Sequence, residues 1–340
     1  MHDKDILLDI RDLSVQFDTD SGVVKAVNHL NLQLERGKSL GFVGETGAGK
    51  TTTALAVLQL IQSPPGRITG GEIYFDGQDI CKMTEAEMRR LRGGRVSMIF
   101  QDPMTSLNPI MTVEDQVSEM VRLHCSLKGE AARERALEML RLVGIRPERA
   151  KDFPHQFSGG MRQRVVIAIA LACRPLLIIA DEPTTALDVT IQAQVLALIK
   201  KLQQSEKTSM LLITHDLGVV AETCDSVAIM YAGHIVEYAD INALYRMPRH
   251  PYTQGLFNAI PTLESDLGTR LAVIPGLPPD PTNLPKGCSF SPRCPYARDV
   301  CHEKACVMHE VAPGHFVDCH FPLTESSGNA FLEKDTLEDG

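Results

Sequence analysis

Hydrophobic residues follow two patterns in the predicted strands of this chain. Apolar and polar positions alternate over residues 6–17 and again over residues 24–34, which predicts antiparallel strands with one buried face. Later runs are mostly apolar without alternation, at residues 96–100, 176–180, 210–214 and 227–230. Continuous apolar runs separated by helical segments are typical of a mostly parallel sheet covered on both faces. The patterns therefore predict an α/β protein with an N-terminal antiparallel β subdomain beside a mostly parallel core sheet.

The stretch between the strands at 96–100 and 176–180 has a different character. Residues 101–174 contain no strand pattern, whereas residues 112–123 and 130–143 have helical periodicity. Gly144 follows the second helix as a plausible stop. We interpret residues 101–174 as a helical insertion in the core.

A phosphate-binding loop is the clearest chemical motif. Residues 44–51 read G-E-T-G-A-G-K-T, after a short apolar strand at 39–43 and before an apolar helix from residue 51 to 61. Glycines turn backbone N–H groups toward one centre, while Lys50 reaches the β- and γ-phosphates and the Thr51 hydroxyl binds Mg²⁺. The alternative is a glycine-rich turn without function. The residues predicted to bind ATP here are Gly44, Glu45, Thr46, Gly47, Ala48, Gly49, Lys50, Thr51 and Thr52.

Two acidic residues follow the apolar run at 177–180. Asp181 is placed to hold Mg²⁺, directly or through water, and Glu182 to orient and deprotonate the water that attacks the γ-phosphate. Acidic pairs also cap strand ends for structural reasons alone. With a phosphate loop upstream, the pattern favours hydrolysis of a nucleotide.

Polar residues after two other strands are expected at the same edge of the sheet. His215 follows the strand at 210–214 and could contact the γ-phosphate, or act as a structural donor. Gln101 could touch Mg²⁺ or the attacking water, or simply end its strand. Asp188 begins a helix that runs to about residue 203, where an Asp is expected as an N-cap regardless of function.

A second anion-binding arrangement lies far from the phosphate loop. Ser158, Gly159 and Gly160 open a helix predicted over 161–173, so a hydroxyl, free N–H groups and the helix dipole coincide. One nucleotide cannot easily bind both loops of one subunit. We therefore expect this loop to face the γ-phosphate held by a partner subunit, with an ordinary Ser-capped helix as the alternative.

Composition narrows the class of protein. The chain has 340 residues, 44% of them hydrophobic, and a formal net charge of −9, which argues against broad electrostatic binding to nucleic acid. Residues 1–5 are charged and lack the apolar core of a signal peptide, and the apolar stretch 165–180 is interrupted by Arg174 and Pro175. The chain is therefore not expected to cross a membrane itself. Nine cysteines without a secretory signal favour thiols or metal ligands over disulfides.

In order and spacing, these motifs resemble the ATP-binding subunits of ABC transporters over roughly residues 6–245. The resemblance implies a head-to-tail dimer in which two ATP molecules lie between one subunit's phosphate loop and the other's signature, residues 158–163. It also implies that Phe17 stacks on adenine, although a strand-core Phe is nearly as consistent with the spacing. Thr46, Ala48 and Met161 depart from the usual family residues without removing a catalytic group.

Residues 98–109, 157–164 and 249–256 resemble more narrowly the dipeptide and oligopeptide importer subgroup. That resemblance implies two membrane permease subunits, often a second, non-identical ATPase, and an extracytoplasmic peptide-binding protein. It places the chain on the cytoplasmic face of the plasma (inner) membrane as a peripheral protein. Related systems carry nickel, glutathione or antimicrobial peptides, so the cargo stays open. The competing hypotheses are a soluble ABC ATPase that acts on nucleic acid or ribosomes, and a simple phosphate-loop kinase.

The C-terminal part holds a group of cysteines in a Pro-rich segment. Cys288, Cys294, Cys301 and Cys319 could bind a [4Fe-4S] cluster or zinc, and either would stabilise a region with little apolar core. Free thiols are the third alternative, because no C-x-x-C pair is present. The subgroup resemblance implies an iron–sulfur cluster at these positions. Other potential ligands keep zinc open: Cys306, His302, His309, His315 and His320.

Three units follow from these observations. An ATPase core is expected over residues 1–100 and 175–245, with a helical subdomain that carries the signature over 101–174. Residues 246–340 form an extension with the cysteine group and an acidic tail. The expected cofactors are ATP, Mg²⁺ and a [4Fe-4S] cluster, with zinc as the alternative to the cluster.

Overall fold

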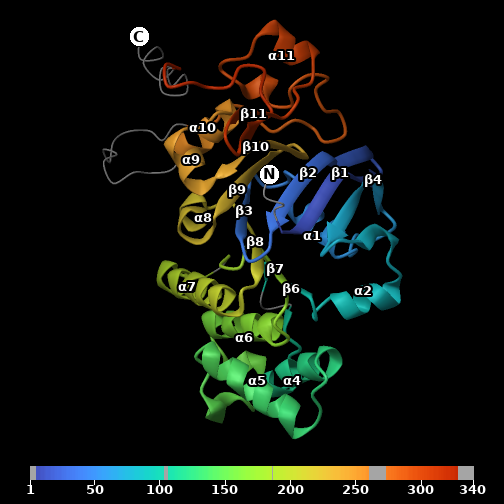
Figure 1. Cartoon of the computed structure of the whole chain (residues 1–340), viewed down its shortest axis with the longest axis vertical. Coiled ribbons are helices and arrows are strands. Elements are labelled where there is room, and N and C mark those ends of the chain that lie inside the picture. Colours follow the sequence, from blue (N-terminus) through green and yellow to red (C-terminus); the bar gives the residue numbers. More distant parts are fainter. Residues whose placement is uncertain (1–4, 103–105, 186, 260–272, 328–340) are drawn as a thin grey trace.

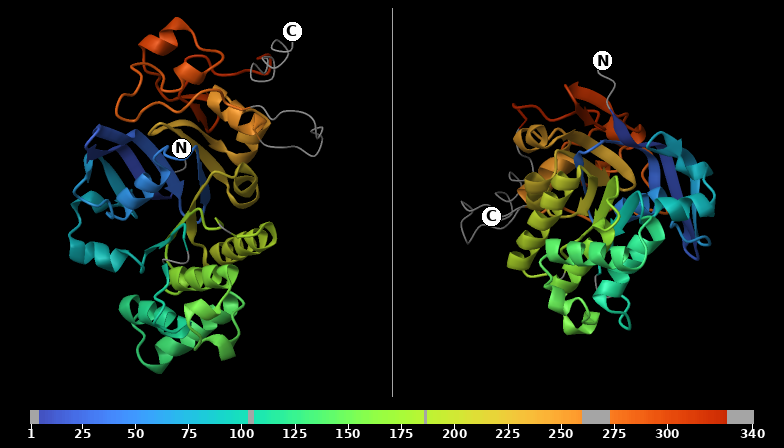
Figure 2. Two further views of the ribbon diagram at one scale, coloured as in Figure 1. Left: turned by 180° about the vertical axis from the view of Figure 1, so that it is seen from behind. Right: turned by 60° about the horizontal axis from the view of Figure 1, so that its bottom comes forward.

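The computed structural model describes residues 5–102, 106–185, 187–259 and 273–327. Figure 1 shows an elongated molecule, with helices α4, α5 and α6 at one end, the C-terminal extension at the other and two sheets between them. The two further views in Figure 2 show the same order of parts.

The N-terminal sheet is antiparallel throughout, as the alternating pattern predicts. Its strands lie in the order β2-β1-β4-β5. They are β1 (Ile6–Thr19), β2 (Gly22–Glu35), β4 (Gly66–Phe75) and β5 (Gln78–Asp79).

The core sheet is mixed, with eight strands in the order β11-β12-β10-β9-β3-β8-β7-β6. Strands β9, β3, β8, β7 and β6 are mutually parallel, whereas β10, β12 and β11 join antiparallel at one edge. The parallel strands are β3 (Ser39–Val43), β6 (Val96–Ile99), β7 (Leu177–Asp181), β8 (Ser209–Thr214) and β9 (Ser226–Tyr231). The antiparallel strands are β10 (His234–Asp240), β11 (His309–Ala312) and β12 (His315–Val317).

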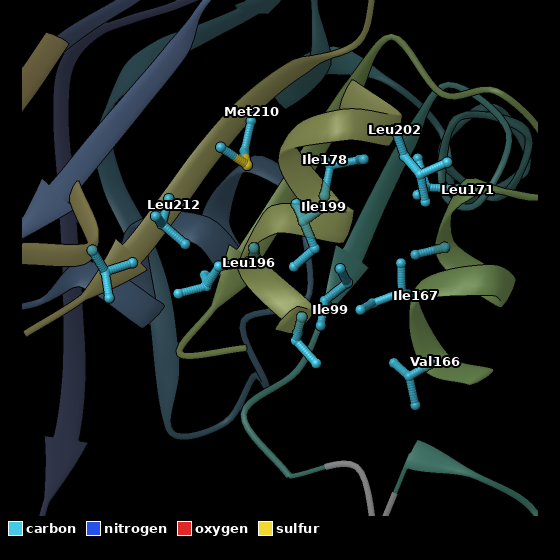
Figure 3. Packing of buried hydrophobic residues seen from close by; sticks show 14 of the residues in the cluster. Ile99, Val166, Ile167, Leu171, Ile178, Leu196, Ile199, Leu202, Met210 and Leu212 are labelled. Carbon is cyan, nitrogen blue, oxygen red and sulfur yellow. The ribbon is translucent and has the colours of Figure 1, made fainter. Parts of the chain in front are cut away.

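Alternate residues of the parallel strands pack into two separate cores. Ile178 of β7 and Leu212 of β8 belong to the cluster under α6 and α7, which Figure 3 shows from close by. Ile179 and Leu211, their neighbours in sequence, belong to the cluster under the N-terminal sheet and α1. Because both faces of the sheet are covered, most positions of these strands are apolar, whichever face they lie on.

The predicted helical insertion is present, and the described part of residues 101–174 contains no strand. Thr112 caps α4 by accepting from the Asp115 N–H, and Gly144 follows α5 with a φ of 81°. The insertion and the helix after β7 are formed by α4 (Val113–His124), α5 (Glu130–Leu142), α6 (Gly159–Leu171) and α7 (Val189–Glu206). The other helices are α1 (Lys50–Val57), α2 (Glu85–Leu91), α8 (Leu217–Thr223), α9 (Ile241–Arg246), α10 (Pro251–Asn258) and α11 (Asp299–Glu303).

The C-terminal extension is joined to the core through the edge of the sheet. Strand β12 pairs with β10, so the hydrogen-bonded sheet crosses the predicted boundary at residue 245. The fully buried Glu237 of β10 accepts hydrogen bonds from the Arg249 and His250 N–H groups and lies 2.7 Å from Nε2 of His315. The three-unit division stays a prediction, and residues 328–340 of the predicted acidic tail lie outside the described residues.

Two further properties concern the membrane and the cysteines. Among the described residues, no helix combines the length and apolar character needed to cross a bilayer. All nine cysteines are described, and each is a free thiol.

Candidate functional site

The phosphate loop connects β3 to α1 and needs glycine where it passes close to other backbone. Gly49 has a φ of 106°, and a Cβ there would lie 2.3 Å from the Ala26 carbonyl oxygen. Gly47 also has a positive φ, but a Cβ there would meet open space. Only a residue without a side chain fits at Gly49 without moving the backbone.

Lys50 lies inside this loop and is buried. Its Nζ donates to the carbonyl oxygens of Gly44 and Glu45, at 2.6 and 2.9 Å. Burial lowers the pKa of Lys50, while the nearby carboxylates of Glu182 and Asp181 oppose that shift. The cation is thus held at the start of α1, where the helix dipole also favours an anion.

A polar cavity of about 340 Å³ lies in front of the loop. It brings together side chains that follow three parallel strands, because the carboxyl ends of such strands meet at one edge of the sheet. The residues that line it are Ala26, Thr46, Gly47, Ala48, Gly49, Lys50, Thr51, Thr52, Gln101, Asp181, Glu182 and His215.

Glu182 is the most connected side chain of the cavity. Gln101 Nε2 donates to its Oε2 at 3.0 Å, the Thr185 hydroxyl donates to the same oxygen at 2.9 Å, and His215 Nδ1 lies 3.1 Å from its Oε1. Its backbone is in the left-handed region, with a φ of 45°. Strained backbone of this kind clusters at functional sites, and the three contacts fix the direction of the carboxylate.

The two carboxylates of the cavity differ in their tendency to hold a proton. Burial raises the pKa of Asp181, and a hydrogen bond from Thr51 only partly offsets it. Burial also acts to raise the pKa of Glu182, but hydrogen bonds from His215 and Thr185 outweigh it and leave that pKa below its ordinary value. Glu182 is therefore ionised at neutral pH and able to accept a proton, while Asp181 and Thr51 lie together as oxygen donors suited to Mg²⁺.

The signature loop lies outside this cavity. Ser158 and Gly159 are exposed at the start of α6, and Ser158 makes no side-chain capping hydrogen bond. A Cβ on Gly160 would lie 2.5 Å from Cγ2 of Ile191, so glycine there permits close packing of α6 against α7. The buried Gln163 donates to the Pro183 carbonyl, which connects the signature helix to the residue after Glu182.

Four more predicted nucleotide contacts do not line the cavity. Phe17 is half-buried against the core under the N-terminal sheet, and Asp188 caps α7 by accepting from the Ile191 N–H. Gly44 lies behind the loop, where a Cβ would meet the Met230 carbonyl. The Glu45 N–H donates to the Tyr252 hydroxyl at 3.0 Å. Direct contact of these residues with ATP stays a prediction.

Two residues of the extension contact the phosphate loop without having been predicted to do so. They are Tyr252 of α10 and Arg293, and both reach Glu45. Tyr252 lies in the segment 249–256 that carries the subgroup resemblance, but no local pattern assigns either side chain to the nucleotide site.

The extension also contains a small cavity lined by cysteines. Cys288, Cys294, Cys301 and Cys319 all border it, together with Cys306 and His250. No group of three or more His, Cys, Asp or Glu side chains in the described parts of the chain is arranged to hold a metal ion. The predicted ligands thus share one cavity without forming such a group, and the cluster stays a prediction.

The thiols of this cavity differ in acidity. A hydrogen bond from Cys306 and the proximity of His250 outweigh burial and lower the pKa of Cys288. Burial raises the pKa of both Cys294 and Cys319 to about 12. Cys294 and Cys319 would therefore have to lose their protons on binding a metal ion.

Comparison with protein families identifies two matching regions. Residues 27–185 match the family model described as ABC transporter, and residues 236–301 match the model described as oligopeptide/dipeptide transporter, C-terminal region. Together they cover the phosphate loop, the signature and most of the cysteines.

Several characterised proteins are similar over nearly the whole chain. The oligopeptide transport ATP-binding protein OppD of Bacillus subtilis is 52% identical over 313 residues, which cover 92% of this chain and 87% of OppD. The dipeptide transport ATP-binding protein DppD of Escherichia coli is 46% identical over 323 residues, 94% of this chain and 98% of DppD.

Among solved structures, a dimeric post-hydrolysis form of the ATP-binding cassette MJ0796 with ADP and Pi aligns with a TM-score of 0.62. The two sequences are 27% identical, and the alignment covers 69% of this chain and 98% of the MJ0796 chain.

Proposed function

Because the chain belongs to the ATP-binding proteins of oligopeptide and dipeptide ABC transporters, we propose that it is the ATP-hydrolysing subunit that drives peptide import. The observation that supports this most directly is the cavity in which the phosphate loop, Asp181, Glu182, Gln101 and His215 meet. Members of this family hydrolyse ATP, and each group in the cavity has a defined task in that reaction.

Glu182 acts on the attacking water. Its carboxylate, ionised and held by Thr185 and His215, takes a proton from the water as the water oxygen bonds to the γ-phosphorus, and the bond from that phosphorus to ADP breaks, so that ADP leaves. Gln101 orients that water, and Lys50 holds the β- and γ-phosphates. Thr51 and Asp181 would hold Mg²⁺, which would neutralise charge on the phosphate oxygens.

The second subunit supplies the signature. The exposed start of α6, with Ser158 at its head, faces the γ-phosphate bound by the neighbouring ATPase, and hydrolysis reopens the pair. The neighbour is a second, related ATPase or a second copy of this chain. Two membrane permease subunits receive the movement, so the complex lies at the cytoplasmic face of the plasma (inner) membrane and receives peptide from an extracytoplasmic binding protein.

Isolation of the intact complex tests the proposal. The tagged chain is purified from detergent-solubilised membranes, and copurifying proteins and bound cargo are identified by mass spectrometry. Two permeases, an ATPase and a peptide-loaded binding protein support peptide import. A binding protein loaded with nickel or glutathione would keep the transport role but change the assigned cargo. Recovery of ribosomes or nucleic acid without permeases would contradict the transport role.

For the extension, we propose that Cys288, Cys294, Cys301 and Cys319 bind a [4Fe-4S] cluster, with zinc as the alternative. All four line one cavity, and thiolates are the ligands that both groups use. A bound group would stabilise a loop-rich region that has little apolar core of its own. Iron, sulfide and zinc analysis of anaerobically purified protein, with the visible spectrum, distinguishes the two. Protein free of all three contradicts the proposal.

A further inference from the structure

An arginine of the extension forms a bidentate ion pair with the phosphate loop. Arg293 ends a short 3₁₀ helix (Ser291–Arg293) and donates to both carboxylate oxygens of Glu45, at 2.9 and 3.1 Å. The two residues are 248 positions apart in the chain. Two parallel N–H···O bonds between guanidinium and carboxylate fix direction as well as distance.

The surroundings of Arg293 hold it in one position. Its side chain is only 6% exposed. The remaining donors bind the Pro275 carbonyl at 3.0 Å, the Ile274 carbonyl at 3.4 Å and the Tyr231 hydroxyl at 3.3 Å. A buried arginine held by this many acceptors cannot turn away from Glu45 without leaving donors unpaired.

A second contact from the extension reaches the same loop residue. The Tyr252 hydroxyl accepts from the Glu45 N–H at 3.0 Å, and the Tyr252 ring packs against Tyr231 with centroids 4.6 Å apart. Both the backbone and the side chain of Glu45 are therefore committed to the extension.

Glu45 in turn holds Lys50. The Lys50 ammonium donates to the Glu45 carbonyl at 2.9 Å, so one residue separates the arginine of the extension from the lysine of the phosphate loop. A displacement of Glu45 moves an acceptor of Lys50 and the N–H groups of the loop beside it.

We propose that Arg293 is a positioning residue for the ATP site, through which the extension sets the geometry of the phosphate loop. The inference rests on the proposed role of residues 44–51 in binding ATP. It gives the extension a task within the ATPase cycle. Cys294, the next residue, lines the cysteine cavity, so the same contact connects that cavity to the nucleotide.

The first test is Arg293→Gln in the full-length chain, measured by fluorescent ATP-analogue binding and by steady-state ATPase kinetics. We expect the dissociation constant of the nucleotide to rise about tenfold, while kcat at saturating ATP changes less than about twofold. The dissociation constant of Arg293→Lys should lie between those of the wild type and Arg293→Gln, because lysine keeps the positive charge but cannot form the bidentate hydrogen bonds of a guanidinium. Arg298→Gln is the matched control, since Arg298 lies over the Phe321 ring of the same extension.

Glu45→Gln serves where Arg293→Gln does not fold, which the unfolding temperature reveals. It removes the carboxylate and should weaken binding to a similar extent, and the double variant should be no weaker than either single variant. An unchanged dissociation constant in a folded Arg293→Gln or Glu45→Gln protein, or fully additive effects, overturns the inference.

Lys50→Ala separates this inference from the proposed function. If Lys50→Ala loses ATP binding while Arg293→Gln and Glu45→Gln keep it, the phosphate-loop assignment stands and the inference on Arg293 is wrong. If Lys50→Ala binds ATP as well as the wild type does, both are overturned.

Discussion

Two helices of this protein begin with glycine and an anion-binding N-terminus, yet their surroundings differ. At the start of α1, Gly49 and Lys50 are buried, and Lys50 lies near the carboxylates of Asp181 and Glu182 in a cavity formed by one chain. The start of α6 is exposed, and Ser158 makes no side-chain capping hydrogen bond. The first N-terminus is surrounded by the groups predicted to be catalytic, whereas the second exposes its hydroxyl and its helix start to solvent.

This contrast indicates that the ATP site is completed by a second subunit. A hydroxyl that neither caps its own helix nor reaches the cavity contributes little to the fold, so its chemistry is available to a partner. The cavity beside α1 has a base and a cation but needs further donors around the γ-phosphate. The α6 of a neighbouring subunit would supply these donors. Four variants test whether the site is shared between two subunits in this way.

Glu182→Gln should have the largest effect. The amide keeps the shape but cannot accept the proton of water, so ATP turnover should fall about 10³-fold while ATP binding persists. Bound ATP should then trap the closed pair, visible as a larger species in size-exclusion chromatography. Turnover at the wild-type rate would remove Glu182 from the role of base.

Gly49→Ala should weaken ATP binding about a hundredfold. The new Cβ would lie 2.3 Å from the Ala26 carbonyl oxygen at a φ of 106°, so the backbone at the start of α1 has to move. Gly47→Ala is the control for a positive φ without a clash, because that Cβ meets open space. Equal losses of affinity in the two variants, measured by isothermal titration calorimetry, would show that the close approach at Gly49 is unimportant.

Ser158→Ala should lower turnover about tenfold, through loss of one hydrogen bond to a charged phosphate. Because Ser158 does not cap its helix, the free energy of unfolding should change by less than about 0.5 kcal/mol. ATPase rates and denaturant unfolding measured on the same preparation check both halves. A Ser158→Ala variant that hydrolyses ATP at full speed as a lone monomer would contradict the shared site.

Thr185→Val should have the smallest effect, a shift of the pH profile. Glu182 works only when ionised, so turnover is lost as pH falls through its pKa. The Thr185 hydrogen bond helps to hold that pKa below its ordinary value against burial, so its removal raises the pKa and moves the acid limb to higher pH. Thr184→Val, one position away, should retain the wild-type acid limb in ATPase assays across pH.

Much of the fold could be predicted from local patterns. Alternation over residues 6–17 predicted an antiparallel strand, and mostly apolar runs predicted the parallel strands, because a strand buried on one face alternates whereas a strand buried on both faces does not. The convergence of Gln101, Glu182 and His215 on the phosphate loop also followed from their place at strand ends.

Contacts of the extension with the core could not be predicted in this way. Strand β12 is three residues long and gives no periodic signal, yet it pairs with β10. Phe17 packs, half-buried, against the core under the N-terminal sheet, and its contact with adenine stays a prediction. The residues next to β12 and next to Phe17 in the sequence give no sign of either packing arrangement.

The chemistry of the nucleotide cavity could be inferred from the order of residues alone, because a phosphate loop acts through its own backbone and each strand end carries its polar residue with it. The direction of the Glu45 side chain, toward Arg293, and the exposure of Ser158 became known only from the folded chain. Contacts between distant segments depend on how whole elements pack, and packing has no repeat that neighbouring residues in the sequence could reveal.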